Sequence, residues 1–486
     1  MSHGEYRPVD TEKLRSIHNA TLEVLEKTGL RVDCADYYEL LESLGAKVER
    51  NSGIVKFPAH IVEGTIEFLR NQIQSGKRQY LLNGVTNPRW TPPLGFKFGG
   101  ACIEYLDFAA DIVRRPTEQD LIRLLQLGEA IDTVGFVGNP VACLIDEKGN
   151  EIAPYMQRIK TAALAAKYTT KCGSTEVWNE RELELLIEIG SIVRGGLAAY
   201  EQKPCFITAK ETIAPLQFPR EDGRILLMLA KKRLPCTIIP MPLTGATSPC
   251  SIAGNVVIAN AEILGVMTCI HAACPDAMVG GGIISGIMDM ATGSASFSAP
   301  EALLQDSVLA QLYDQYYGQD LAIGTGYTDA KYPGIQSLAE KTMKFFSAAQ
   351  QGRFNFPVGL LAGGKRFSPE QAILDLEIAQ SIKRLFSKIE VTDDMLAVDV
   401  IGEVGIGKEF LSHEHTLEHF RKNLWSPALA DRSATSTLNA ERRHDMLAAA
   451  HEKVEQILCR DDLYKIDKDR ERAIDNVVAK AERVLK

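Results

Sequence analysis

A polar loop at residues 324–331 carries the densest group of side chains suited to chemistry. Tyr327, Asp329 and Lys331 follow two glycines there, and glycine lets the backbone approach a ligand closely. A lysine in such a place is a candidate Schiff-base nucleophile, and the neighbouring polar side chains are candidate pocket contacts. The alternative is an ordinary turn with a capping aspartate and a surface lysine. We expect the loop to belong to a site.

A histidine cluster, His413-Glu414-His415, is a second candidate. On a strand, alternate residues face one side, so both imidazoles would point together. A zinc site needs about four ligands, and no nearby cysteine or aspartate completes a set. We therefore expect no metal here. We expect His413 to hydrogen-bond a ligand, or else to cap a helix or lie at the surface.

Composition and missing motifs disfavour other classes of function. Lys and Arg number 54 against 63 Asp and Glu, and this net charge of −9 disfavours nucleic-acid binding. The sequence contains no G-x-S-x-G, H-E-x-x-H or G-x-x-x-x-G-K-[ST] motif. The ten cysteines form no C-x-x-C pair, so we expect most to be reduced and buried. No apolar run nears about 18 residues and no signal-like N-terminus occurs, so we expect a cytoplasmic protein outside the membrane.

The elements that must position these side chains alternate from Thr117 onward. Seven units of strand and helix follow one another, with the first strand at 133–141 and the last at 355–361. Strands that alternate with helices favour a parallel sheet, and more than six units favour closure into a (β/α)8 TIM barrel. We expect the eighth strand at 409–411. A hairpin or a pair of short strands is expected at 96–108.

These elements predict an α/β protein in three parts. Residues 1–115 form a helical and hairpin extension packed on the barrel, 116–435 form the barrel, and 436–486 form C-terminal helices. In such a barrel the loops after the strands hold the site. The candidates in those loops include Asn139, Trp178, Glu211, Thr244, Ser248 and Gly281.

Several segments, taken together and in order, resemble the trimethylamine methyltransferase superfamily. They are Thr244-Gly-Ala-Thr-Ser-Pro249 with Ala253-Gly254, Ala259-Asn-Ala-Glu262, Tyr327-Thr-Asp-Ala-Lys331, Phe98-Gly-Gly100 with Leu106-Asp107, and Trp425-Ser-Pro with Asp431-Arg432. The likeness runs from about Leu14 to Arg443. It implies a barrel enzyme that moves a methyl group from a methylamine or betaine to the cobalt(I) of a corrinoid protein.

The resemblance also implies a substrate class. Archaeal trimethylamine enzymes of the family carry pyrrolysine, whereas this chain contains only the standard twenty residues. Relatives without pyrrolysine act on quaternary amines, glycine betaine among them. A quaternary ammonium that loses a methyl group leaves as a neutral tertiary amine, so no acid is needed on the leaving nitrogen. We expect glycine betaine first, with proline betaine, carnitine or γ-butyrobetaine as alternatives.

The resemblance suggests binding roles and no catalytic side chain. Aromatic faces hold quaternary ammonium groups at roughly 0.5–2 kcal/mol per contact, and Tyr327 is the first candidate, before Phe356 and Trp178. Glu211 would offset the charge of the cation. Candidate donors for a substrate carboxylate are Lys331, His413 and Asn139. Asp329 is a further substrate-binding candidate, and the candidate loop-lining residues are Thr244, Ser248 and Gly281.

The methyl acceptor is expected to arrive on another protein. No D-x-H-x-x-G cobalamin motif occurs, so the corrinoid would sit on a separate carrier that docks transiently at the barrel mouth. We expect no permanently bound cofactor and a homo-oligomer. Two other functions stay open, namely a Schiff-base lyase that uses Lys210 or Lys331, and a betaine-binding protein without enzymatic activity.

Overall fold

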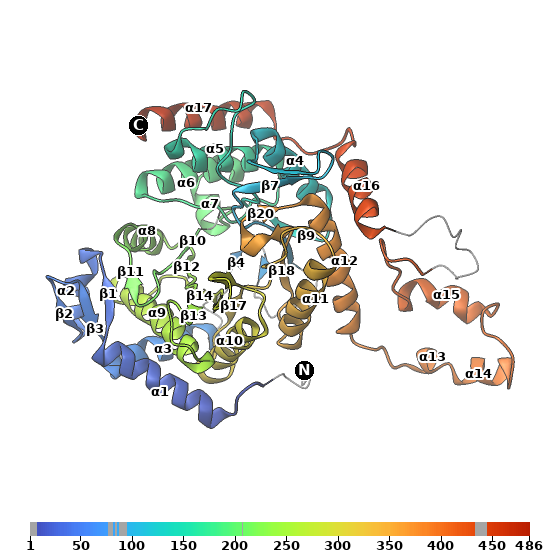
Figure 1. Cartoon of the computed structure of the whole chain (residues 1–486), viewed down its shortest axis with the longest axis horizontal. Helices are drawn as coiled ribbons and strands as arrows, with labels where there is room; N and C mark the ends of the chain where they lie inside the picture. The colour runs from blue at the N-terminus through green and yellow to red at the C-terminus, as the bar shows by residue number, and fades with distance from the viewer. Residues whose placement is uncertain (1–6, 76–80, 83–84, 87–94, 207, 433–444) are drawn as a thin grey trace.

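The computed structural model describes residues 7–75, 81–82, 85–86, 95–206, 208–432 and 445–486 (Figure 1). In these residues, short parallel strands occupy the centre of the body and helices surround them. An N-terminal layer packs on one side, and an arm projects from the opposite side.

The N-terminal layer combines helices with a small sheet. Its elements are α1 (Thr11–Lys27), β1 (Leu30–Val32), η1 (Ala35–Tyr37), α2 (Tyr38–Ser43), β2 (Lys47–Glu49), β3 (Ile54–Lys56) and α3 (Ala59–Gln74). Asp10 caps α1 by accepting a hydrogen bond from the Lys13 N–H at 2.8 Å. The buried leucines of α1 face the body, where α1 contacts α9 (Ile252–Ala273). β1 pairs with β3 and also, in parallel, with β11 (Gln217–Phe218), which ties this layer to the middle of the chain.

The central strands form two parallel sheets. They are β6 (Gly95–Phe98), β9 (Val134–Val137), β10 (Ala209–Lys210), β12 (Cys236–Ile238), β14 (Val279–Ile283), β17 (Leu321–Ile323) and β18 (Asn355–Val358). One sheet has the order β10-β12-β14-β17 and the other the order β18-β6-β9. A parallel bridge from Val137 to Cys172 adds one more segment beside β9. This is an α/β fold in which the described pairings do not run continuously around a closed barrel.

The sequence predicts a hairpin or a pair of short strands at 96–108, and the structure has the pair of short strands, β6 and β7 (Glu104–Asp107). They form no hairpin with each other, because β6 pairs in parallel with β18 and β9 and the hairpin forms between β7 and β8 (Ile112–Arg114). The eighth strand predicted at 409–411 is wrong, because those residues form no strand and lie just before a helix. The chain therefore contributes the additional parallel strand near its beginning rather than its end.

The helices that surround the strands touch one another in chain order. They are α4 (Glu118–Ala130), α5 (Pro154–Tyr168), α6 (Glu180–Arg194), α7 (Leu197–Gln202), α8 (Arg220–Lys231), α9, α10 (Pro300–Gln311), η2 (Leu312–Tyr317), α11 (Ile335–Gln350) and α12 (Pro369–Leu385). Contacts run from α4 through α5, α6, α8, α9, α10 and α11 to α12. α16 (Met446–Leu458) contacts both α12 and α4, and α17 (Lys468–Val484) lies over α5 and α6 (Figure 1). The chain's last helices therefore complete and cover the helical layer.

Helix α9 is long, apolar and mostly buried. By length and composition its 22 residues are sufficient to cross a membrane, which corrects the expectation that no such segment exists. In the described structure 72% of its most apolar window is buried inside the protein, and α1, α3 and α10 pack against it. The apolar side chains of α9 therefore pack in the protein core. Within it, Glu262 accepts a hydrogen bond from the Leu216 N–H at 2.8 Å, and burial raises the pKa of this carboxyl to about 6.

Short strands build the loops that follow the parallel strands. They are β13 (Leu243–Thr244), β15 (Gly286–Asp289) and β16 (Ser294–Ser296) in one sheet, and β19 (Leu360–Leu361) and β20 (Arg366–Phe367) beside β7 and β8, with η3 (Ala362–Gly364) between them. β4 (Leu81–Leu82) and β5 (Val85–Thr86) pair with each other. The loops after β12, β14 and β18 thus have regular structure of their own.

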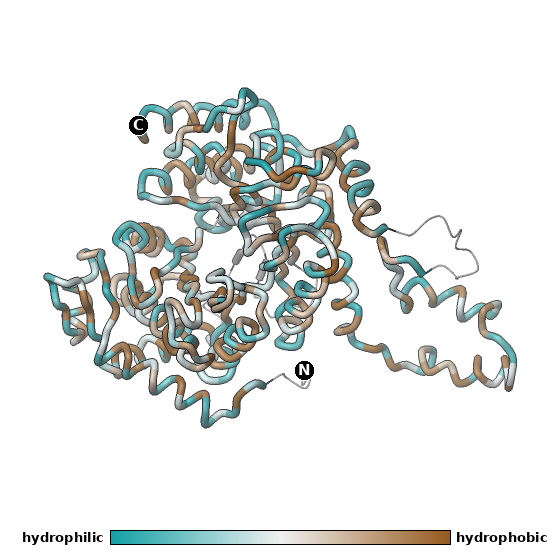
Figure 2. Tube along the Cα trace, in the orientation of Figure 1, coloured by the Kyte–Doolittle hydropathy of each residue, from teal (hydrophilic) through white to brown (hydrophobic). Residues whose placement is uncertain are grey.

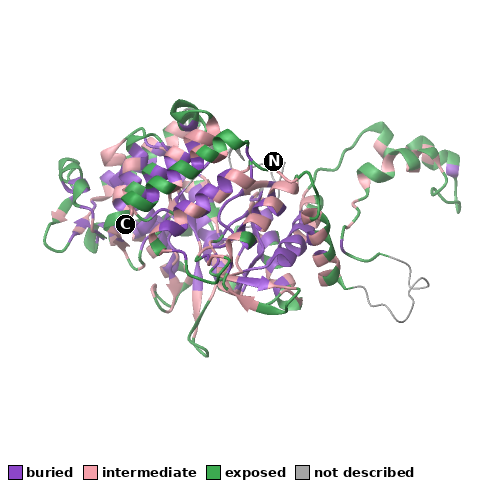
Figure 3. Ribbon diagram, turned by 90° about the horizontal axis from the view of Figure 1, so that it is seen from above, coloured by how far each residue is buried: buried purple, intermediate pink, exposed green. Residues whose placement is uncertain are grey.

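Residues 387–427 form the arm, which extends away from the body (Figures 1 and 3). It contains α13 (Asp393–Leu396), α14 (Val398–Val404) and α15 (Glu414–Asn423). α13 and α15 have no buried residue, and large apolar side chains such as Ile406, Leu411 and Leu417 are exposed. Figure 2 shows hydrophobic and hydrophilic residues intermixed along it. The chain returns to the body where the Glu377 carboxylate accepts hydrogen bonds from the N–H groups that follow the arm.

Candidate functional site

Loops after four parallel segments converge on the side chain of Tyr327. Cys102 follows β6, Glu176 follows the Cys172 bridge, Glu211 follows β10 and Tyr327 follows β17. Burial raises the pKa of the Tyr327 hydroxyl well above its usual range, and Cys102, Glu211 and Glu176 add to the rise. Such electrostatic effects require proximity, because charges interact less strongly as their separation grows. The four side chains therefore share one region at the carboxyl ends of the strands.

The ring of Tyr327 is held in one orientation by its neighbours. Its centroid lies 5.7 Å from that of Phe297, and the Lys344 ammonium is 5.9 Å from the ring centroid. Gly364 packs against the ring so closely that an added Cβ would be 2.4 Å from Cε1 of Tyr327. Gly364 also has φ +86°, which disfavours other residues. The partly exposed Tyr327 ring is thus fixed while solvent still reaches it.

Glu211 is accessible to solvent and yet surrounded by protein. Its side chain is exposed, but desolvation by the enclosing atoms raises its pKa to about 7. Lys210 opposes this rise, while Glu176 and Asp222 support it. Desolvation at the end of β10 therefore brings the pKa of Glu211 close to neutral pH although solvent still reaches the side chain.

Lys210 is not available as a free amine in this structure. Its side chain is buried, its Nζ donates to the Val177 carbonyl at 2.9 Å, and it lies 2.8 Å from Oδ1 of Asp222. An ammonium held in such an ion pair is a poor nucleophile, because nucleophilic attack needs the neutral amine. This arrangement speaks against a Schiff-base role for Lys210.

Asn139 lies just beyond β9 and carries an unsatisfied polar group. Its backbone N–H donates to the Ser174 carbonyl at 3.0 Å, which joins two neighbouring strand ends. Its buried Oδ1 and the buried Oγ1 of Thr175 have no hydrogen-bond partner among the described residues. Buried polar atoms normally find partners, so these two oxygens are candidates for contact with a ligand or water. Asn139 thus lies where the sequence predicts, at a strand end of the same face.

Thr244 and Ser248 shape the loop before α9 through hydrogen bonds of their own. Thr244 Oγ1 accepts from Nε2 of Gln305 at 2.5 Å, and Ser248 Oγ accepts from Nδ2 of Asn255 at 2.8 Å. Neither residue caps α9, because Ser251 does so by accepting from the Gly254 N–H at 3.2 Å. Both hydroxyls support the loop and are already bonded to protein groups.

Three other candidates point away from Tyr327 or pack elsewhere. Phe356 is fully buried and stacks on Phe345 at 4.5 Å, outside the strands. Gly281 faces α9, since an added Cβ would meet side chains of that helix. Trp178 is 58% exposed, and its ring covers the Arg158 guanidinium at 3.8 Å. In each case strand alternation or a local cation sets the direction of the side chain.

Asp329 and Lys331 lie in the same loop as Tyr327, but their side chains have different neighbours. Asp329 accepts hydrogen bonds from Ser296 and from the Phe297 N–H, so it anchors the ring that flanks Tyr327. The Lys331 side chain is exposed, and its carbonyl accepts from Arg366. Asp329 therefore positions a neighbour of Tyr327, whereas Lys331 lies at the surface.

His413 lies on the arm and not among the strand ends. It is the N-cap of α15, where its Nδ1 accepts from the His415 N–H at 3.1 Å, and its Nε2 is 3.3 Å from Glu403. The strand expected around it is absent, which is the physical reason for the difference. His413 thus caps a helix, which is one of the alternatives expected from the sequence.

The sequence analysis missed Glu176 and Phe297. Glu176 lies in a loop that the barrel pattern places correctly, but a lone glutamate there carries no signal of its own. Phe297 precedes α10 in a segment without a motif. The two residues become candidates only in the structure, where Glu176 affects the pKa of Tyr327 and the Phe297 ring lies beside the Tyr327 ring.

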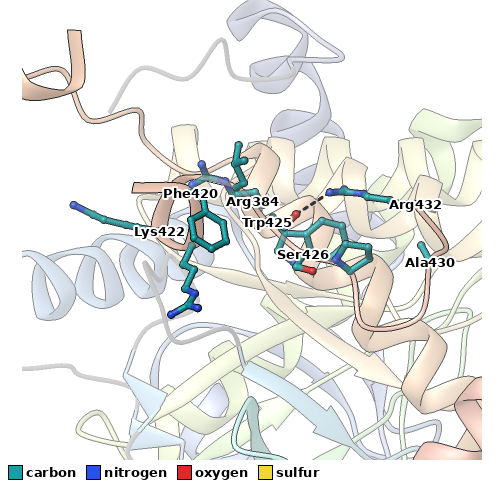
Figure 4. A pocket seen from close by; sticks show the side chains of 10 residues that line it. Arg384, Phe420, Lys422, Trp425, Ser426, Ala430 and Arg432 are labelled. Carbon is teal, nitrogen blue, oxygen red and sulfur yellow. Dashed lines mark hydrogen bonds between the residues drawn. The ribbon is translucent and has the colours of Figure 1, made fainter. Parts of the chain in front are cut away.

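A separate open hollow of about 700 Å³ lies between the arm and α12 (Figure 4). Basic and aromatic side chains line it, among them Arg384, Phe420 and Trp425. Arg432 donates to the Trp425 carbonyl at 2.8 Å, and its guanidinium is 5.2 Å from the indole centroid. None of the strand-end residues described above lines this hollow.

Comparisons with known proteins agree over almost the whole chain. The trimethylamine methyltransferase (MTTB) family matches residues 2–485. A trimethylamine methyltransferase of Desulfitobacterium hafniense strain DCB-2 is 29% identical over 452 residues, covering 92% of this chain and 88% of that protein. A glycine betaine methyltransferase of Desulfitobacterium hafniense strain Y51 is 26% identical over 464 residues, covering 93% and 92%.

A solved structure shares the fold. The crystal structure of the Methanosarcina barkeri monomethylamine methyltransferase superimposes with a TM-score of 0.52 at 12% identity, covering 99% of this chain and 89% of that chain. At this identity the likeness concerns the fold alone. Because the family match spans nearly the whole sequence and no pyrrolysine occurs in it, this chain belongs to the trimethylamine methyltransferase family, in its branch without pyrrolysine, and is a methyltransferase.

Proposed function

We propose that this chain moves a methyl group from a quaternary amine to the cobalt of a corrinoid carried by a separate protein. The carrying observation is that Tyr327, Glu211 and Glu176 each follow the carboxyl end of a parallel segment, namely β17, β10 and the Cys172 bridge, and that both carboxylates act on the pKa of the Tyr327 hydroxyl. An aromatic face and two carboxylates attract a cation. Glu211 is reached by solvent, so the region is open to the outside, as delivery to a second protein requires.

The proposal includes a (β/α)8 barrel that surrounds this region. The order β18-β6-β9 with the Cys172 bridge, and the separate order β10-β12-β14-β17, supply eight parallel segments that such a barrel would join into one ring. The helical layer that α16 completes supports this closure. Such barrels hold their sites at the carboxyl ends of the strands. In this proposal the barrel begins at β6, before residue 116, and the C-terminal helices close it from outside.

The chemistry asks the protein mainly to bind and orient. One carbon–nitrogen bond breaks and its electron pair stays on nitrogen, while the cobalt(I) electron pair forms the new bond to carbon. The amine product is neutral, so no proton has to be delivered to it. The Tyr327 ring and the two carboxylates would hold the cation with one methyl group directed outward. The corrinoid supplies the nucleophile.

Glycine betaine is the first substrate to test, because a relative bears its name. The carboxylates of Glu211 and Glu176 disfavour a substrate carboxylate that lies close to them. Substrates with a more distant carboxylate, such as γ-butyrobetaine or carnitine, therefore belong in the same test. Asn139 is the carboxylate-binding candidate that lies at the strand ends, whereas Lys331 and His413 lie elsewhere.

A spectral assay tests the proposed function. The protein is incubated with reduced corrinoid carrier and with glycine betaine, proline betaine, carnitine, γ-butyrobetaine or trimethylamine, and the loss of cobalt(I) absorbance is followed. We expect at least one quaternary amine to methylate the corrinoid and trimethylamine to remain inactive. If every compound is inactive with every carrier tried, the proposal fails.

Substitutions of Tyr327 test the cation site separately. Y327F keeps the aromatic face and should bind the active substrate within about twofold of wild type. Y327L removes the face and should weaken binding by roughly 2- to 30-fold, the equivalent of 0.5–2 kcal/mol. Isothermal titration calorimetry measures both variants. Equal binding by Y327L and wild type would place the cation elsewhere.

A further inference from the structure

Three metal-ligating side chains meet on the arm, apart from the strand-end region. Asp394 lies in α13, and His415 and His419 lie one helical turn apart in α15. One ligand atom of each lies within 4.8 Å of those of the others. Residues four apart on a helix project from the same face, so α15 presents both imidazoles toward α13.

The distances within this cluster suit a shared ion. Nε2 of His419 is 3.3 Å from Oδ2 of Asp394, yet this buried nitrogen makes no hydrogen bond among the described residues. A tetrahedral zinc ion with ligands at about 2.0–2.1 Å separates two ligand atoms by about 3.3 Å. The His415 and His419 ring centroids are 4.3 Å apart, and a hydrogen bond of 3.2 Å between Nε2 of His415 and the Asp394 carbonyl oxygen holds the His415 ring against α13. All three side chains thus surround one small volume.

We propose that Asp394, His415 and His419 bind one divalent transition-metal ion, with Zn²⁺ as the best fit, and that this ion joins α13 to α15. Imidazole and carboxylate are ligands that zinc accepts in tetrahedral sites, and water completes the fourth position. Two neutral imidazoles and one carboxylate leave the occupied site with a single positive charge. The exposed Asp394 gives an ion a path from solvent.

The arm has few other sources of tertiary stability. α13 has 4 residues and α15 has 10, and neither contains a buried residue. Helices of such length are marginal in water on their own. An ion that links them would therefore contribute to their folding, because binding free energy at a structural metal site stabilises the folded state. This inference is independent of the methyl-transfer proposal.

Cobalt(II) titration of the untagged full chain tests the site. After removal of metal by chelator, we expect one equivalent of Co²⁺ to bind with the visible absorption of a tetrahedral ion, and Zn²⁺ to displace it. H419Q and D394N each remove one ligand. Changes outside the ligands already cost roughly 10- to 100-fold in affinity, so we expect a loss of about 100-fold or more.

H413N is the matched control. His413 lies beside the cluster on the same arm, and asparagine preserves its N-cap role, so H413N should bind Co²⁺ like wild type. Zn²⁺ should also slow proteolysis within 387–427 in wild type and H413N but not in H419Q. The proposal is overturned if wild type binds no equivalent of Co²⁺, if H419Q keeps its affinity, if H413N loses as much as H419Q, or if Zn²⁺ leaves proteolysis of wild type unchanged.

Discussion

Glu211 illustrates how enclosure changes the chemistry of one residue. The same carboxyl on an open surface would be fully ionised at neutral pH, but desolvation raises its pKa to about 7. At that pKa about half of the molecules carry the charge at pH 7. A bound cation favours the ionised form, so substrate binding and deprotonation of Glu211 are linked.

The affinity for a quaternary amine should increase about tenfold from pH 6 to pH 8. The ionised fraction of a group with a pKa of about 7 rises from roughly 0.1 to 0.9 over this interval, and the apparent affinity follows the competent fraction. Calorimetric titrations at pH 6, 7 and 8 measure this dependence. E211Q should bind more weakly at pH 8 and show little dependence on pH. A slope in E211Q equal to that of wild type would assign the effect to another group.

At the scale of elements, a buried ion pair joins α11 to α12. Nζ of Lys341 and Oδ2 of Asp375 are 2.8 Å apart, and both side chains are 0% exposed. Asp375 also accepts from the Gly359 N–H at 2.8 Å, just beyond β18. The pair thereby connects two helices of the outer layer to the end of a central strand. Breaking such a pair is costly because it leaves a buried charge without a partner.

K341M should lower the free energy of unfolding by about 3–5 kcal/mol, because it leaves the Asp375 carboxylate unpaired in the core. The double variant K341M/D375N should recover part of this loss, since asparagine is neutral and still accepts from Gly359. Thermal and denaturant unfolding of wild type, K341M and the double variant give the comparison. A double variant less stable than K341M would contradict the role assigned to the buried charge.

At the scale of the whole molecule, the chain divides into a packed body and a thinly packed arm. Helices α12 and α16 contact each other although the arm lies between them in sequence. The chain re-enters the body at Glu377, eight residues before the end of α12, or roughly 12 Å along the helix. The packing of the body therefore does not depend on the arm. The arm is available to bind the proposed metal ion and to line the basic hollow beside α12.

Replacing residues 388–426 by six Gly/Ser residues should leave the body folded. Six extended residues reach roughly 20 Å, which exceeds the gap at α12. We expect the Tm of the body to change by less than about 3 °C, because Val404 is the one buried residue in α13, α14 and α15. Substrate affinity should stay within about twofold, since the strand-end residues lie outside the arm. Differential scanning calorimetry and substrate titration check both points, and an unfolded variant would show that the arm supports the core.

Most of the alternation of strands and helices between Thr117 and Leu385 was predictable, because each element carries its own period of apolar residues. The second of the seven predicted strands is only an isolated bridge at Cys172. The loop with Tyr327 was predictable too, since glycines and polar residues gather within a few positions. The short strand β6 falls within the prediction for 96–108, but its parallel pairing was not predictable, because its partner β18 lies some 260 residues away and local pattern says nothing about such pairing. Gly281 and Phe356 were expected at the site, but both face the surrounding helices. The reason is related, because alternation along a strand decides which residues face the centre and which face outward.

The sequence by itself therefore determined most element types and the family, and it placed Tyr327 in a loop after a strand. Tertiary structure alone decided which carboxylates join Tyr327, because Glu176 and Glu211 come from separate loops that only the sheet brings together. It also decided the partners of His415. Assigned to a strand, His415 pairs with His413, whereas the helix pairs it with His419 and places Asp394 opposite. The physical reason is the same in both cases: chemistry depends on distance in space, and folding sets that distance between residues far apart in the chain.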